Sequence, residues 1–185
     1  PEVLGLAALI AYTLSREEAR VQGGEFVALE DQDPSRWDTE LLHRASVYLA
    51  RAKALDRFGR FQLEAAIQAV HADRLQTGVT DWYSLAQLHL GLSHIAPTIG
   101  SAVGHAAALG KAVGPAEGLQ ALYQVDAKAR AAFAPAEATR AYLLNELGKT
   151  QEAAAAYDRA ISLTVEAPLR RYLETKRAEL GRGLV

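Results

Sequence analysis

Apolar residues recur at spacings of three and four along almost the whole chain of 185 residues. Such spacing places them on one side of an α-helix, so the periodicity predicts a succession of amphipathic helices. Half of the residues are apolar but only 7% are aromatic, because alanine and leucine dominate. This composition also favours helices, since alanine and leucine are among the best helix formers. The sequence therefore predicts an all-α fold.

Glycine and proline divide this periodicity into separate helices, because both residue types interrupt a helical backbone. The pair Gly23-Gly24 ends the first helix, and residues 26–29 follow as a short extended segment. Asp33 is then expected to cap a helix whose first residue is Pro34. The expected helices cover roughly residues 2–21, 34–58, 60–77, 82–96, 98–112, 115–125, 136–147, 150–163 and 167–180. The buried stripe of the second is Trp37, Leu41, Ala45, Tyr48, Ala52 and Leu55.

The C-terminal part of the chain carries a pattern typical of a tetratricopeptide (TPR) helix pair. Small residues there let two helices approach closely, a large ring fills the gap, and Gly148 allows a turn with positive φ. A weaker version lies between residues 105 and 122, where Gly118 replaces the expected alanine. The TPR-like positions are Ala141, Leu144, Gly148, Ala153, Tyr157 and Ala160. We therefore expect a TPR-like helix-turn-helix solenoid, a right-handed stack of about 8–9 helices.

Charge and composition argue against several classes of function. The chain has 20 basic and 22 acidic residues, so its net charge of −2 lacks the basic excess of a self-sufficient nucleic-acid binder. The absence of cysteine excludes disulfides and sulfur-based zinc sites, and it is compatible with a reducing cytosol. We therefore expect a chain that does not bind DNA directly, and its composition is compatible with the expected cytoplasmic location.

Catalytic, metal-binding and membrane motifs are also missing from the sequence. The serines lie in no nucleophile-elbow context, and the glycine-rich residues 100–114 contain no phosphate-binding P-loop. His89 and His94 are five residues apart, which is a poor spacing for a helix-borne zinc pair. His71 is expected to be a core histidine that is hydrogen-bonded to a neighbour, and Val3–Leu14 is too short to cross a bilayer. The sequence thus predicts no enzyme activity, no cofactor, no metal and no membrane partner.

Charged residues, a proline and a tryptophan crowd into residues 30–38. One interpretation is a protein-interaction surface, because Trp and Arg are favoured anchors and carboxylates pair with basic partners. The other is local: Asp33 caps a helix, Trp37 packs inside, and Arg36 bridges Asp31 or Asp38. Both interpretations can hold at once. The candidate interaction residues are Asp31, Gln32, Asp33, Arg36, Trp37 and Asp38.

The same run belongs to an ordered series of motifs that resembles the long helical C-terminal extension of one group of extracytoplasmic-function (ECF) RNA polymerase sigma factors. That extension opens with an apolar helix, paired arginines and a glycine-containing turn, and it continues with a run like this one. The resemblance covers nearly the whole chain, and its specificity comes from the order of the motifs together. The sequence departs from that family at Gly104-His105-Ala106, where the family has Asn-Arg-Ala. The matching motifs are Asp31–Asp38, Phe61–His71, Thr80-Asp81-Trp82, Gly114–Leu119, Tyr157–Thr164 and Arg170–Glu174.

This resemblance implies a regulatory domain of a bacterial sigma factor. It implies that promoter DNA is reached only through sigma domains N-terminal to Pro1, which would contact this domain and the RNA polymerase core. Since the chain begins at Pro1 and has no methionine, we expect a piece of a longer protein. We predict one domain over residues 1–185, with a family-specific helical part over 1–97 and TPR-like helix pairs plus a capping helix over 98–185.

Two other interpretations remain open. The chain could be a free-standing TPR-like adaptor for an unrelated protein or peptide, or a small-molecule sensor with a pocket between the helices of Trp37 and Trp82. A basic cluster near the C-terminus could touch DNA or polymerase, but interleaved acidic residues favour a solvated helix face. Its members are Arg170, Arg171, Lys176, Arg177 and Arg182.

Overall fold

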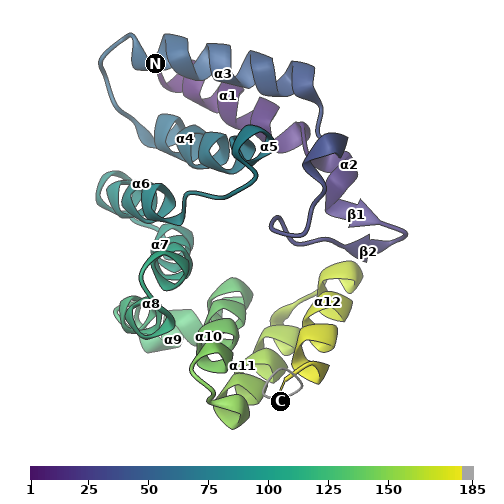
Figure 1. Ribbon diagram of the computed structural model, residues 1–185. Coiled ribbons are helices and arrows are strands. Elements are labelled where there is room, and N and C mark those ends of the chain that lie inside the picture. Colours follow the sequence, from purple (N-terminus) through teal and green to yellow (C-terminus); the bar gives the residue numbers. More distant parts are fainter. Residues whose placement is uncertain (181–185) are drawn as a thin grey trace. The chain divides into compact units, whose positions relative to one another are not determined.

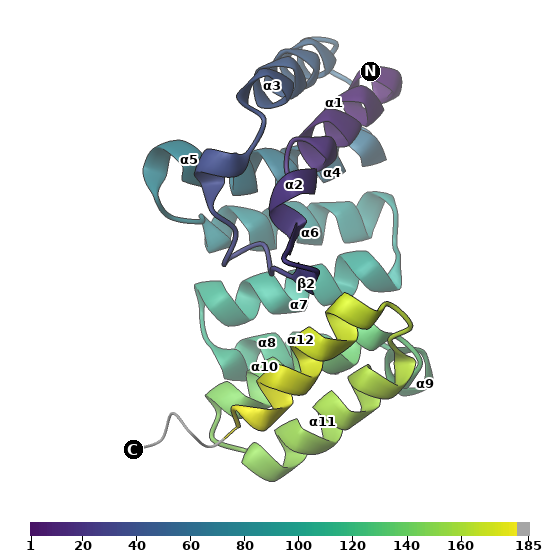
Figure 2. The ribbon, with the colours of Figure 1, turned by 90° about the vertical axis from the view of Figure 1, so that its right-hand side faces the viewer.

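The computed structural model describes residues 1–180 of the chain (Figures 1 and 2). Nearly all of its regular structure is helical, which confirms the predicted all-α, solenoid-like fold. The chain forms two compact units. Unit 1 contains Pro1–Gly23 and Val27–Pro97, and unit 2 contains Gly24–Phe26 and the residues from Thr98 onward. The predicted assignment of residues 1–185 to one domain stays a prediction.

Unit 1 is built around α1, which packs against both α3 and α4 (Figure 2). Ala11 and Tyr12 of α1 meet Ala45 of α3 in a small buried cluster. Helix α4 also packs against α6. The elements of this unit are α1 (Glu2–Leu14), α2 (Glu17–Arg20), β1 (Val21–Gln22), η1 (Pro34–Arg36), α3 (Thr39–Lys53), α4 (Arg60–Ala72), α5 (Arg74–Thr77) and α6 (Trp82–Ile95). Strand β1 pairs with β2 (Glu25–Phe26) in a two-stranded hairpin.

The predicted helix over residues 2–21 is wrong at its C-terminal end, because α1 stops at Leu14. The Ser15 hydroxyl donates to the carbonyl oxygen of Tyr12 at 2.7 Å. The Ser15 carbonyl accepts the N–H of Asp38 at 2.8 Å, so it is used by a distant segment rather than by the next helical turn. The chain therefore turns at Ser15 and Arg16 before α2 begins.

The predicted start of the second helix at Pro34 is also wrong. Asp33 caps only the short 3₁₀ turn η1, after which Trp37 has an extended backbone with φ −79° and ψ 140°. Helix α3 begins at Thr39, and the Asp38 carboxylate accepts the N–H of Leu41 at 2.9 Å as its cap. Leu55 lies beyond the end of this helix and is 51% exposed, so it does not belong to the predicted buried stripe.

Unit 2 contains the predicted TPR-like helix pair, α10 and α11, packed side by side (Figure 1). The predicted positions other than Gly148 are all buried, and Gly148 has the expected positive φ of 72°. Helix α12 packs on α11, and its expected role as a capping helix stays a prediction. The short helix α9 was not predicted. The elements are α7 (Ile99–Ala112), α8 (Pro115–Leu122), α9 (Ala127–Ala131), α10 (Ala134–Glu146), α11 (Thr150–Leu163) and α12 (Ala167–Ala178).

Two glycines allow α7 and α8 to cross at very short range. A Cβ atom on Gly118 would lie 2.7 Å from the Cα of Gly110 and 2.8 Å from the carbonyl oxygen of Ala106. Both neighbours are backbone atoms, which cannot rotate away as a side chain would. The glycine at this TPR-like position is therefore required by the close approach of the two helices.

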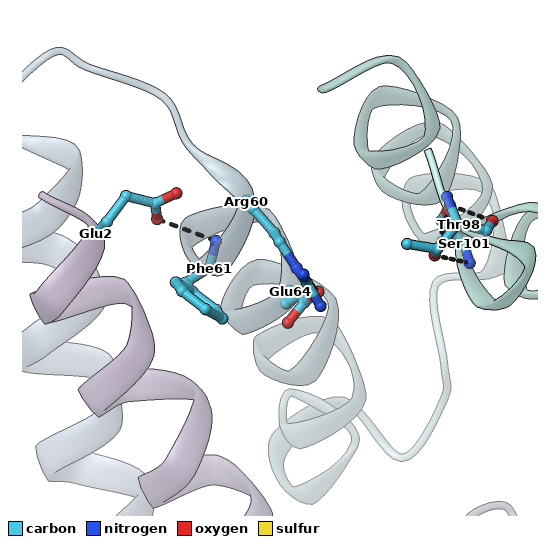
Figure 3. Close-up of polar contacts among 6 residues, drawn as sticks. All are labelled: Glu2, Arg60, Phe61, Glu64, Thr98 and Ser101. Atoms are coloured by element: carbon cyan, nitrogen blue, oxygen red, sulfur yellow. Dashed lines mark hydrogen bonds and ion pairs between the residues drawn. The ribbon is translucent and has the colours of Figure 1, made fainter. Parts of the chain in front are cut away.

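Local capping contacts position the ends of α4 and α7 (Figure 3). The Glu2 carboxylate accepts the N–H of Phe61 at 3.0 Å, which satisfies a free donor in the first turn of α4. Thr98 and Ser101 exchange side-chain and backbone hydrogen bonds in a capping box at the start of α7. This box explains why a glycine-rich segment begins a helix. None of the described helices has the length and apolar character needed to span a bilayer.

Candidate interaction site

The residues from Glu30 to Asp38, here called the acidic loop, have mostly exposed side chains and two buried ones. Gln32 and Trp37 point inward and are 5% and 3% exposed. The remaining four candidate interaction residues, Asp31, Asp33, Arg36 and Asp38, are exposed. The loop is thus anchored from within and presents one guanidinium and four carboxylates to solvent, because Glu30 is exposed as well.

Arg74 of α5 holds the acidic loop in place. Its guanidinium donates to the carbonyl oxygens of Glu30 and Gln32, each at 2.7 Å. The same guanidinium lies 5.2 Å from the centre of the Trp37 ring, in a cation–π arrangement. The sequence analysis did not connect Arg74 with this loop, because no local pattern joins residues so far apart in the chain.

Local hydrogen bonds fix the acidic loop at Asp33 and at Asp38. The Asp33 carboxylate accepts the N–H of Ser35 at 2.9 Å. The Asp38 carboxylate accepts the N–H of Leu41 at 2.9 Å and so caps α3. Hydrogen bonds from Ser35 lower the pKa of the Asp33 carboxyl, and the charge of Arg36 lowers it further. The local interpretation is therefore confirmed for the cap at Asp33 and for the packing of Trp37.

Arg36 does not hold the loop in the predicted way. Its guanidinium donates to the carbonyl oxygen of Glu18 at 3.2 Å, and no ion pair with Asp31 or Asp38 occurs in the described part of the chain. The Asp31 carboxylate likewise has no partner among residues 1–180. Asp31 can therefore pair with a basic group from outside without breaking an internal contact.

A second group of polar residues lies close to the loop anchor in unit 1. Arg16 donates Nη2 to the amide oxygen of Gln68 on α4. His71 packs edge-on against Trp82, with 6.0 Å between ring centres. Burial lowers the pKa of His71 to about 4, assisted by the charges of Arg16, His89 and Arg74. His71 is therefore a neutral, largely buried ring at neutral pH, and ring packing is its described contact.

The basic cluster near the C-terminus is engaged within unit 2. Arg171 binds the Glu25 carboxylate at 2.8 Å, and Arg177 binds Asp158 at 3.1 Å. Arg170 donates to the carbonyl oxygen of Thr164, and Lys176 pairs with Glu179. The remaining member, Arg182, lies outside the described residues. In residues 1–180, no group of three or more His, Asp or Glu side chains is placed to hold a metal ion.

Comparisons with known proteins give a family and one relative. Residues 1–53 match a family of unknown function, DUF6596, and this segment covers α1 to α3 with the acidic loop. An uncharacterized protein of Rhizobium meliloti (strain 1021) is 33% identical over 174 residues, which is 94% of this chain and 41% of the relative. The chain thus spans about two fifths of the length of that relative. No solved structure gives a significant match.

Proposed function

We propose that this chain is the regulatory C-terminal region of a bacterial ECF sigma factor and acts in transcription initiation through protein–protein contacts. The acidic loop carries the proposal, because its residues are also one of the motifs on which the sigma-factor resemblance rests. Its partners are the sigma domains of the same protein or the RNA polymerase core, in the cytoplasm. Promoter DNA is reached only through those sigma domains, since exposed carboxylates repel phosphates.

The construction of the loop supports a docking role. Gln32 and Trp37 are buried, and Arg74 binds two of the loop's carbonyl oxygens, so the loop has little conformational freedom left to lose on binding. Asp31, Asp33 and Asp38 face solvent within a short stretch and suit a basic partner surface. Electrostatic contacts of this kind govern partner choice and the rate of association more than affinity.

The extent of the relative also supports the proposal. More than half of the Rhizobium protein lies outside the region that matches this chain. A helical region of this size attached to further domains is the arrangement that a sigma-factor extension requires. The alternative, a free-standing TPR-like adaptor for an unrelated protein or peptide, is favoured by the well-formed α10–α11 pair in unit 2.

In vitro transcription with one core polymerase and one promoter tests the proposal. It compares the full-length protein with a version that ends just before Pro1, and then adds this chain in trans. We expect the truncation to change transcription and the added chain to reverse that change. Equal transcription from both proteins would remove the regulatory role and leave the adaptor as the better account.

Charge reversal within the full-length protein tests the loop itself. We expect Asp31→Lys to change transcription by several-fold, because Asp31 is exposed and has no internal partner in the described part of the chain. Glu174→Lys is the matched control, because Glu174 of α12 is also exposed and lies far along the sequence from the loop. The same response from both variants would show an effect of net charge rather than docking by the loop.

A further inference from the structure

Arg16 brings a positive charge into unit 1, and no carboxylate among the described residues forms an ion pair with it. It lies at the turn between α1 and α2, and its Nη2 is used by the amide of Gln68. Its Nη1 is shielded from solvent and has no hydrogen-bond partner within the described residues. Burial lowers the pKa of this guanidinium to about 10, assisted by the charges of Arg20 and Arg74, so Arg16 is still charged at neutral pH. Such a charge requires an anion or a full set of hydrogen bonds.

Arg74 is a second cation in the same environment. Its partners are two carbonyl oxygens and the Trp37 ring, none of which carries a negative charge. Two guanidinium groups thus influence each other without a carboxylate partner for either among residues 1–180. Coulomb repulsion between two like charges is unfavourable, and a nearby anion would offset it.

Two further polar atoms, both in the acidic loop, lack hydrogen-bond partners among the described residues. The indole Nε1–H of Trp37 and the amide oxygen of Gln32 are both buried and form no hydrogen bond in the described part of the chain. Their residues are 3% and 5% exposed. Buried polar groups are nearly always hydrogen-bonded, because an unmade bond there loses the hydration of the group and gains nothing. Trp37 Nε1 and Arg16 Nη1 are donors, so an acceptor placed next to them would satisfy both.

We propose that unit 1 binds a phosphate group, as inorganic phosphate or a small phosphate monoester, between Arg16 and Arg74 and beside the Trp37 indole. A phosphate carries about 1.5 to 2 negative charges at neutral pH and offers several acceptor oxygens, so it matches two guanidinium groups better than a singly charged carboxylate does. Its oxygens accept from Arg16 Nη1, from Trp37 Nε1 and from the unused N–H groups of Arg74. Because both orphan donors are shielded from solvent, the anion enters through a transient local opening of unit 1.

This site does not depend on the sigma-factor proposal, since every group that forms it lies in unit 1 of this chain. A metal cation does not fit, because two arginines would repel it. His71 adds to the site a neutral ring whose N–H can donate to an anion, and it is near enough to Arg16 and Arg74 to be influenced by their charges.

The two tryptophans of the chain, Trp37 and Trp82, make the test direct. In a ¹⁵N-labelled chain of 185 residues they give two indole N–H signals, and Trp82→Phe identifies the signal of Trp37. Inorganic phosphate is titrated against sodium acetate at equal ionic strength. We expect a saturating downfield shift of the Trp37 signal with phosphate and not with acetate. The midpoint temperature of thermal unfolding should rise by about 5–10 °C at a phosphate concentration 100-fold above the measured Kd.

Variants separate the proposed site from general charge effects. Arg16→Gln should abolish the indole shift and the thermal stabilisation, whereas Arg51→Gln, at an exposed position on α3, should keep both. O-phosphoserine and AMP, in parallel titrations, show whether a bare phosphate or a monoester binds more tightly. The proposal would be overturned if the chemical shift of the Trp37 indole in the wild-type chain did not change with any of the three phosphates. It would also be overturned if that shift changed equally with acetate. Neither outcome depends on the stability of the variants.

Discussion

His71 makes the stability of unit 1 depend on pH in a way that can be calculated. Burial, with the charges of Arg16, His89 and Arg74, lowers the pKa of this ring from 6.5 to about 4. The unfolded chain therefore takes up a proton at His71 near pH 6.5, and the folded chain does so only near pH 4. Acid thus favours the unfolded state, and stability falls as the pH drops through this window.

The size of the effect follows from the difference between the two pKa values. One pKa unit corresponds to about 1.4 kcal/mol, so a lowering from 6.5 to about 4 amounts to about 3 kcal/mol in total. About 2 kcal/mol of this should be lost between pH 7 and pH 5. For a chain of this length, that loss lowers the midpoint of thermal unfolding by about 4–8 °C.

His71→Phe isolates the contribution of this residue. Phenylalanine keeps an aromatic ring against Trp82 but cannot take up a proton, so the carboxyl groups that titrate elsewhere contribute equally to both proteins. The free energy of unfolding is measured by urea titration at pH 7, 6 and 5. We expect the wild type to lose about 2 kcal/mol more than His71→Phe between pH 7 and pH 5. Parallel losses in the two proteins would refute the assignment of this pH dependence to His71.

Two further predictions concern helix packing and capping. Gly118→Ala should lower the free energy of unfolding by about 1–3 kcal/mol, because its Cβ would lie 2.7 Å from the Cα of Gly110. Gly100→Ala, whose Cβ would meet only a side-chain oxygen at 3.8 Å, should be neutral or stabilising by the same urea measurement. Asp38→Ala should destabilise by about 1 kcal/mol through loss of the α3 cap. Asp31→Ala, at a position without a described partner, should change stability by less than about 0.5 kcal/mol.

The sequence was most informative where structure depends on neighbours along the chain. The TPR-like pair was predicted correctly at Ala141, Leu144, Ala153, Tyr157 and Ala160, because helical spacing and small residues are local signals. Helix α9 was missed although it carries such a signal. The Asp126 carboxylate accepts the N–H of Ala129 at 2.8 Å, and an aspartate before an alanine-rich run is a recognisable cap.

The sequence was least informative where distant segments decide the local conformation. The break after α1 depends on a hydrogen bond between Ser15 and Asp38, and the acidic loop depends on Arg74. No periodicity relates these positions. The sequence does contain a signal for the start of α3 at Thr39, since Asp38 is as good an N-cap residue as Asp33. Choosing between the two required knowledge that Trp37 is anchored under Arg74 in an extended conformation.

The pH dependence of His71 and the proposed phosphate site are thermodynamically linked. An anion between Arg16 and Arg74 would offset two of the charges that lower the pKa of His71, so that pKa would rise towards 6.5. Each unit of that rise would remove about 1.4 kcal/mol from the acid-induced loss of stability. Reciprocity then requires the anion to bind more tightly as His71 becomes protonated.

Sulfate is the suitable probe for this linkage, because it keeps both negative charges between pH 7 and pH 5. The loss of unfolding free energy between these pH values should be smaller in sodium sulfate than in sodium chloride at equal ionic strength. General effects of sulfate on burial act on every variant, so Arg16→Gln is the control that should show no such difference in slope. If sulfate reduced the pH-dependent loss of unfolding free energy equally in Arg16→Gln, the linkage between His71 and the proposed anion site would be refuted. The sulfate effect would then not require Arg16, the principal ligand of the site.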